Sequence, residues 1–401
     1  MAHVVIVGAG PAGSSLAYLL ARRGVQVTLL ERQQGFDREF RGEVLTPSGL
    51  DALRQMGLAD ALEQVPSQDQ TSVTFHLNGK KLFHQSFEGE VLEKNPPRAV
   101  SQPRLLEMLV AEASKSESFR IEEGASVKAL IQEEGRVVGV RVRTQTGEEQ
   151  IRADLIVGAD GRASIVRKQG GFRVQRVSPP MDIIWAKLPC PKDWQGAHAY
   201  VGKGHLLLGY RSWDGCLQLG WTIEKGAFGE VKAHGIDHWF SEMEAHVTPE
   251  LAAHLRAEKA NAHKPFFLDA ESDCVENWSI PGALLIGDAA HTMSPVGGQG
   301  INIALRDSIV AANHLVPELL KSDPGSLDSV LAEIERERMP EVRKIQRLQA
   351  FPPRIWFNRA GWGEPVRRVL GQLARSSAVR RVVAWRVSDF AFGVTDVRLR
   401  V

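Results

Sequence analysis

The chain has 401 residues, of which 43% are apolar and 24% are charged, and its formal net charge is +1. This composition is typical of a globular protein of about two or three domains, and it excludes a chain that is disordered throughout. The balanced charge provides no global positive field, so we expect no nucleic-acid partner.

The cysteines and the apolar stretches indicate the compartment. Cys190, Cys216 and Cys274 form no CxxC pair, which argues against a disulfide framework or a zinc site and is typical of a reducing cytosol. The first residues lack the basic region and cleavage site of a secretion signal. The most apolar later stretch is interrupted by Asp288 and is too short to span a bilayer. We therefore predict a cytoplasmic protein.

The N-terminal segment predicts a strand, a glycine-rich turn, a helix and a second strand, in that order. Residues 4–7 (VVIV) form a buried β-branched run, and residues 25–31 (VQVTLLE) form another. Between them stands Gly8-x-Gly10-x-x-Gly13, whose glycines permit a tight turn, the close approach of a pyrophosphate and the packing of the helix. A carboxylate at the end of the second strand suits ribose hydroxyls. We predict a dinucleotide site formed by Gly8, Gly10, Pro11, Ala12, Gly13, Glu31 and Arg32.

The middle of the chain alternates between strand-like and helix-like segments. Two extended runs about Asn78-Gly79 predict a hairpin, and a helix is predicted from Pro103. Residues 121–158 and 181–223 each predict several strands, and a last buried strand at 283–291 leads into a helix. Nucleotide-binding α/β pieces are therefore expected to interleave with an antiparallel sheet.

The C-terminal region carries a local excess of positive charge. From Pro340 to the end there are 13 Arg and Lys residues and four acidic ones. We expect these charges to form a solvated face of terminal helices. The alternative is peripheral contact with an anionic membrane surface, because tryptophans and phenylalanines interleave with the charges.

Two later segments resemble motifs of a known family. Residues 155–167 (LIVGADGRASIVR) resemble the Asp-Gly motif of the FAD-dependent aromatic hydroxylases, and residues 284–307 resemble their Gly-Asp motif. This is the p-hydroxybenzoate hydroxylase type of flavoprotein monooxygenase, and especially its ubiquinone-biosynthesis-hydroxylase-like branch. The resemblance covers roughly residues 1–55, 98–170 and 280–310.

The resemblance implies roles for individual residues. It places Asp288 against the ribityl chain of FAD, and it gives Asp160, Gly161 and Arg167 contacts with FAD and NAD(P)H. It places Pro295 beside the reactive C4a edge, which makes Pro295 and Gly298 the candidate catalytic residues. The flavin pyrimidine is then surrounded by Gly298, Gly300, Ile301 and Asn302. A helix that starts near Ile301 would direct its positive end at the reduced ring.

Three further residues are assigned on weaker grounds. The resemblance implies that Arg41 lies near the flavin and its phosphates, and that Gln102 contacts FAD, with Arg104 as a plausible substitute. His291 follows Asp288 by three residues but has no partner pair for a metal, so we predict a structural role and no metal site.

The resemblance also implies the fold class and the domain ranges. We expect an α/β protein with a Rossmann-like FAD-binding domain (1–70, 98–178 and 268–340), an antiparallel-sheet substrate domain (71–97 and 179–267) and C-terminal helices (341–401). The substrate would lie against the middle sheet, whose aromatic residues suit a core and a pocket lining equally: Trp185, Tyr200, Tyr210, Trp213 and Trp221.

The implied activity is that of an FAD-dependent monooxygenase. Such an enzyme takes electrons from NADPH or NADH, reacts with O2, and hydroxylates an aromatic or quinone-like small molecule through a C4a-hydroperoxyflavin. One alternative is a flavin-dependent reductase of isoprenoid double bonds, similar to geranylgeranyl reductases. A second is a non-catalytic escort protein, which the persistence of Asp160, Asp288 and the GGQG loop disfavours. A halogenase is disfavoured because only fragments of Trp-x-Trp-x-Ile-Pro are present.

Overall fold

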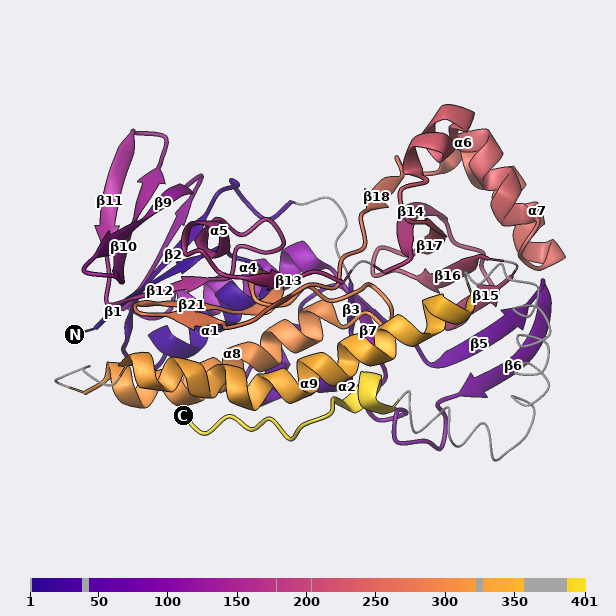
Figure 1. Ribbon diagram of the computed structural model, residues 1–401. Coiled ribbons are helices and arrows are strands. Elements are labelled where there is room, and N and C mark those ends of the chain that lie inside the picture. The colour runs from indigo at the N-terminus through magenta and orange to yellow at the C-terminus, as the bar shows by residue number, and fades with distance from the viewer. Residues whose placement is uncertain (1, 38–42, 178, 203, 322–326, 357–387) are drawn as a thin grey trace.

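Figure 1 shows a computed structural model of the chain, which describes residues 2–37, 43–177, 179–202, 204–321, 327–356 and 388–401. Two sheets dominate the fold. One carries the glycine-rich turn, and the other is built from two segments that lie far apart in the sequence.

The first sheet has six strands in the order β20-β21-β12-β1-β2-β8. All neighbouring pairs are parallel except β20 with β21. The β-branched run VVIV lies in the centre as β1, where residues 4–6 are fully buried, as a strand covered on both faces requires. The bounds are Ser279–Ile280 (β20), Ala283–Leu285 (β21), Leu155–Gly158 (β12), His3–Val7 (β1), Gln26–Glu31 (β2) and Phe119–Glu123 (β8).

Helices pack against this sheet and against one another. Helix α1 packs on α8 and α4, and both α2 and the long helix α9 also pack on α8 (Figure 1). Their bounds are Pro11–Ala21 (α1), Pro47–Gln55 (α2), Gln102–Ala113 (α4), Gly300–Leu319 (α8) and Leu327–Trp356 (α9). Position 341, the predicted start of the C-terminal region, therefore falls inside a continuous helix.

The second sheet has seven strands in the order β18-β14-β17-β16-β15-β5-β6. The hairpin β5–β6 turns at Asn78 and Gly79, whose positive φ angles of 50° and 73° are those of the predicted two-residue turn. Helices α6 (Phe228–Glu244) and α7 (Pro249–Glu258) pack against one face. The bounds are Phe266–Leu268 (β18), Met181–Pro189 (β14), Cys216–Glu224 (β17), Leu206–Arg211 (β16), Ala197–Val201 (β15), Ser72–Leu77 (β5) and Lys80–Ser86 (β6).

Smaller elements complete the described chain. A three-stranded antiparallel sheet is formed by β9 (Ser126–Glu133), β10 (Arg136–Arg143) and β11 (Glu148–Arg152). The remaining elements are β3 (Val44–Leu45), β4 (Ser67–Asp69), β7 (Arg98–Val100), β13 (Val174–Gln175), β19 (Cys274–Val275), α3 (Ala59–Leu62), α5 (Ile165–Gln169) and the 3-10 turns η1 (Lys259–Asn261) and η2 (Gly287–Ala289). The predicted interleaving of a parallel α/β unit with a mostly antiparallel sheet is confirmed.

Candidate active site

Three loops meet at the carboxyl edge of the six-stranded sheet, because β1, β12 and β21 run parallel and side by side. At Gly8, where φ is 101°, a Cβ atom would lie 2.6 Å from the carbonyl oxygen of Ala159. At Gly287, where φ is 58°, a Cβ atom would lie 2.9 Å from the Cβ of Ala12. The glycine turn therefore touches both other loops, and glycine is required at these contacts.

Arginine side chains connect the two later loops. Arg167, in α5, donates a hydrogen bond from Nη1 to the carbonyl oxygen of Ala289 (3.1 Å). Arg162 donates to the carboxylate of Asp288 at 3.4 Å, and the Asp288 side chain is 34% exposed. The structure thus brings the Asp160 and Asp288 loops together and leaves the Asp288 carboxylate partly accessible at their junction.

The carboxylate of Asp160 organises its own turn. It accepts hydrogen bonds from the hydroxyl of Ser164 and from the backbone N–H groups of Ile165 (2.6 Å) and Val166 (3.3 Å). Burial raises the pKa of Asp160 and outweighs these bonds, which lower it. Because the carboxylate is engaged locally, Asp160 determines where α5 and Arg167 lie.

Glu31 is buried and joins the glycine turn to the loop after β2. Its Oε2 accepts the backbone N–H of Ala9 at 2.9 Å, and its Oε1 accepts that of Gln33 at 3.0 Å. These two bonds fix the carboxylate between the glycine turn and the loop after β2. Arg32, the next residue, is exposed.

The segment 292–299, named here the Pro295 loop, is held from behind by helix α9 and the C-terminal segment. Gln349 donates from Nε2 to the carbonyl oxygens of Ser294 and Val296, both at 2.7 Å. Gln299 donates to the carbonyl oxygen of Phe390 at 2.9 Å. A Cβ atom at Gly297 would lie 2.8 Å from the Phe390 ring, so this aromatic residue covers the loop.

Asn302 uses its side chain within the protein. Its Oδ1 accepts the N–H of Thr46 at 2.9 Å, and its Nδ2 donates to the carbonyl oxygens of Val44 (3.2 Å) and Gly298 (2.8 Å). The amide thereby connects the start of α8 with β3 and α2. The backbone N–H groups in the first turn of α8 have no acceptor within the helix. These N–H groups, at the positive end of the helix, are the ones that remain to contact a ligand there.

A buried ionic network lies behind the Asp288 loop, and the sequence analysis missed it. His291 and Arg338 both bond to the carboxylate of Asp307 at 2.7 Å, and Arg338 also pairs with Glu341. Arg306 forms two bonds with Glu341, at 3.0 and 2.9 Å. Burial alone would raise the pKa of Glu341, but these two arginines lower it to about 2. The i,i+3 spacing of Arg338 and Glu341 on a helix was the available sequence signal.

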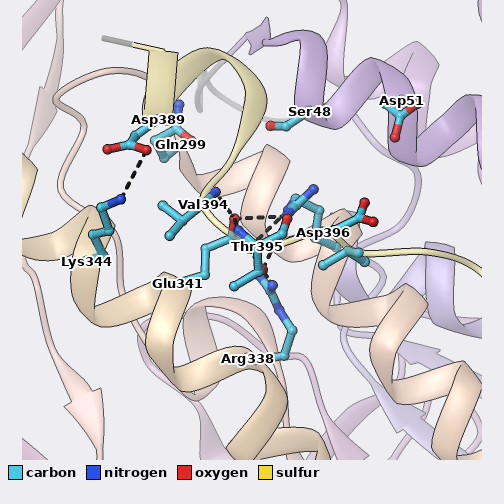
Figure 2. Close-up of polar contacts among 12 residues, drawn as sticks. Ser48, Asp51, Gln299, Arg338, Glu341, Lys344, Asp389, Val394, Thr395 and Asp396 are labelled. Atoms are coloured by element: carbon cyan, nitrogen blue, oxygen red, sulfur yellow. Dashed lines mark hydrogen bonds and ion pairs between the residues drawn. The ribbon is translucent and has the colours of Figure 1, made fainter. Parts of the chain in front are cut away.

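The same network holds the C-terminal segment. Glu341 accepts the backbone N–H of Val394 at 2.6 Å, and Figure 2 shows Arg338, Glu341, Val394 and Thr395 together. Farther along α9, Lys344 pairs with Asp389 at 3.2 Å. The segment that covers the Pro295 loop is therefore fixed by buried charges.

Arg41 and most of the basic region (357–387), with the membrane contact proposed for it, lie outside the described residues. Gln102 is the first residue of α4 and is partly buried. Arg104 is 61% exposed and pairs with Glu107 at 2.7 Å on the same helix, so its guanidinium is engaged at the surface.

The site fits the adenine dinucleotide part of FAD. A Cβ atom at Gly10 would meet nothing within 4 Å, so the backbone there is open to a pyrophosphate. The first turn of α1 contains no acidic residue that would repel phosphates. In the described residues, no cluster of three or more His, Cys, Asp or Glu side chains could hold a metal ion.

A glycine turn and two acidic loops at the carboxyl edge of a parallel sheet, joined to a second sheet, define a dinucleotide-binding flavoprotein. The chain belongs to the FAD binding domain family, whose model matches residues 1–347. It is 31% identical over 400 residues to 6-methylpretetramide 4-monooxygenase from Streptomyces rimosus, covering 99% of this chain and 94% of the relative. It is 28% identical over 370 residues to squalene epoxidase 1 from Arabidopsis thaliana, covering 87% and 66%.

Solved structures show the same fold. p-Nitrophenol 4-monooxygenase PnpA from Pseudomonas putida superposes with a TM-score of 0.78 at 18% identity, covering 99% of this chain and all of the other (100%). PqsL from Pseudomonas aeruginosa, a probable FAD-dependent monooxygenase, gives 0.77 at 21% identity, covering 89% and 97%. The protein is an FAD-dependent monooxygenase and hence an oxidoreductase. Within the described ranges, none of the helices is long and apolar enough to cross a bilayer.

Proposed function

We propose that the protein uses NADPH or NADH to reduce FAD, and transfers one oxygen atom from O2 to an aromatic or quinone-like small molecule. The observation that carries this proposal is the position of Val296 in the Pro295 loop. Val296 packs in one apolar cluster with Trp185 and Tyr210 of the seven-stranded sheet. The loop assigned to the reactive edge of the flavin therefore meets the sheet assigned to the substrate.

The residues of the chain have distinct parts in this reaction. Bound FAD would supply a hydride acceptor and the means to activate O2. The positive end of α8 would stabilise negative charge on the reduced ring. Gln349, Gln299 and Phe390 keep the Pro295 loop in place, and the apolar sheet excludes water from the reacting atoms.

The aromatic class of substrate is supported by the relatives. The Streptomyces rimosus relative is named as acting on 6-methylpretetramide, and PqsL has been solved in complex with 2-aminobenzoylacetate. PnpA is named as acting on p-nitrophenol. We extend this class to the present chain because the cluster that faces Val296 is lined by aromatic and aliphatic side chains.

A stopped-flow screen tests the proposal. The FAD-loaded protein is mixed anaerobically with NADPH or NADH in the presence of single phenols and quinones. We expect at least one compound to accelerate flavin reduction, and O2 uptake in air to match NAD(P)H consumption. NAD(P)H consumption that needs an isoprenoid alkene and no O2 would instead support the reductase alternative, and the monooxygenase proposal would be abandoned.

A further inference from the structure

The last residues of the chain, 394–401, are named here the tail. Residues 396–401 belong to no helix or strand, and they run as an extended trace to the C-terminus (Figure 1). The tail is bound by side chains from three helices, which together are named here the tail site. They are Gln55 at the end of α2, Arg306 and Asn313 on α8, and Glu341 on α9.

Two carboxamides of the tail site bind the main chain of the tail as a neighbouring β-strand would. Gln55 donates from Nε2 to the carbonyl oxygen of Val397 at 3.0 Å and accepts the N–H of Leu399 at 2.8 Å. Asn313 makes the same pair of bonds one residue later along the tail, both at 2.7 Å. Successive peptide groups of an extended chain point to opposite sides, so α2 binds one side of the tail and α8 the other.

The side chains of the tail alternate in the same way. Val397 is 3% exposed and belongs to the main apolar core, and Leu399 and Val401 pack against that core. Arg398 and Arg400, which lie between them, are exposed. The tail site therefore fits an extended peptide with apolar side chains at every second position, and it supplies hydrogen bonds to the peptide's main chain.

The buried ionic network extends this binding toward the start of the tail. Glu341 accepts the backbone N–H of Thr395 at 3.3 Å in addition to that of Val394. Arg306 donates to the carbonyl oxygen of Thr395 at 2.5 Å. These bonds also reach main-chain atoms, so the conformation of the tail is recognised along most of its length.

The tail site is connected to the part of the protein that is assigned to the flavin. Phe390, which covers Gly297, lies just ahead of the tail in the sequence. At their N-terminal ends α2 and α8 are joined by the Asn302 amide, which accepts the N–H of Thr46. The tail joins the same two helices a second time, through Gln55 and Asn313. Removal of the tail would therefore loosen both the cover of the Pro295 loop and the contact between α2 and α8.

We propose that the tail site is a peptide-binding site for the chain's own C-terminus, and that its occupancy is linked to FAD binding. The docked tail keeps Phe390 against the Pro295 loop and α2 against α8, so the docked form binds FAD more tightly. Linkage is reciprocal, so FAD must retain the tail by the same factor by which the tail strengthens FAD binding. This inference rests on the position assigned to the flavin and is independent of the substrate class.

Amide hydrogen exchange, followed by mass spectrometry on the full chain, measures docking of the tail. The amides of Leu399 and Arg400 are bonded to the tail site, so exchange in the C-terminal peptide reports the undocked population. We expect saturating FAD to slow this exchange at least about fivefold. In the apoprotein, Asn313→Leu should accelerate it about tenfold, because two bonds to the tail are lost. Exchange at the exposed turn between β9 and β10 should change in neither case.

The variant Val397→Asp measures the same linkage from the side of FAD. A carboxylate in place of this buried side chain should expel the tail, because an unpaired charge is strongly disfavoured in an apolar core. Titration of flavin fluorescence should then give a Kd for FAD that is higher by the factor by which FAD slows exchange in the unchanged protein. Val91→Asp is the matched control, because it makes the same substitution at a residue that is 75% exposed, and its Kd should be unchanged.

The outcomes separate this inference from the assignment of FAD. Exchange of the C-terminal peptide that FAD does not slow would overturn the inference alone, as would equal Kd values in Val397→Asp and Val91→Asp. Unchanged exchange in Asn313→Leu would also overturn it, because the tail site would then not hold the tail. If Val397→Asp does not fold, the exchange of the unchanged protein with and without FAD decides. If the unchanged protein binds no FAD, the assignment of the flavin falls as well.

Discussion

Gly10 and Gly13 belong to one turn, but the structure assigns the requirement for glycine to different causes. At Gly10 the backbone is extended (φ −77°, ψ −176°), which any residue adopts, and a Cβ atom would meet nothing within 4 Å. At Gly13 a Cβ atom would lie 1.9 Å from the carbonyl oxygen of Gly8. We therefore expect Gly10 to be needed by the ligand, and Gly13 by the fold.

Gly10→Ala should leave the apoprotein intact and weaken FAD binding. A glycine replaced in a compatible conformation stabilises a protein by about 0.4–1 kcal/mol, because the unfolded chain loses freedom. With FAD bound, the added methyl group would occupy the space of a phosphate oxygen. Overlap of this size costs about 1–3 kcal/mol, which corresponds to a Kd roughly 10- to 100-fold higher.

Gly13→Ala should instead destabilise the protein, by about 3 kcal/mol or more, because the atom it would strike belongs to the backbone. The assay for both variants is urea unfolding of the apoprotein followed by tryptophan fluorescence, together with FAD titration followed by quenching of flavin fluorescence. Unchanged FAD affinity in Gly10→Ala would refute the assignment of this turn to the pyrophosphate. Equal destabilisation by the two substitutions would refute the separation of their roles.

Three further outcomes are expected. Glu341→Gln removes the carboxylate partner of the buried Arg306 and one of the two carboxylate partners of Arg338, and it should lower the free energy of unfolding by about 3–5 kcal/mol. Glu148→Gln, at an exposed ion pair, should lower it by less than about 1 kcal/mol, and urea unfolding measures both. Burial lowers the pKa of His76 from 6.5 to about 4, so as the pH falls the unfolded chain binds a proton at this residue before the folded protein does. The free energy of unfolding should therefore fall by about 2 kcal/mol between pH 6.5 and pH 4. Urea unfolding of His76→Gln should lack this part of the pH dependence. Phe390→Ala uncovers Gly297 and should raise the Kd for FAD about threefold or more, measured by the same titration; an unchanged Kd would contradict a role of the C-terminal segment at this loop.

The central features of the fold follow from local sequence patterns. The run VVIV, the glycine turn and Glu31 specify a βαβ unit within about thirty consecutive residues. A parallel sheet then requires the loops after β1, β12 and β21 to meet at one edge, which the structure confirms for Gly8, Ala159 and Gly287. These predictions succeed because each depends on short-range periodicity and one topological rule.

Other features depend on contacts that no local pattern encodes. The side-chain amide of Asn302 bonds to the backbone of Thr46, 256 residues away in the sequence. The contact of Phe390 with Gly297 and the pairing of Tyr210 on β16 with Gln218 on β17 likewise depend on packing and strand register. A single-residue shift in register would turn Tyr210 to the other face of the sheet, so the sequence alone could not assign the sheet's aromatic residues to one face or the other.

Isotope labelling tests the central claim most directly. The FAD-loaded protein, NAD(P)H and the aromatic compound that most accelerates flavin reduction are incubated under ¹⁸O2, and the product is analysed by mass spectrometry. The account predicts a product that carries one ¹⁸O atom on the aromatic ring. A product without the label, or one labelled only from H2¹⁸O, would contradict it.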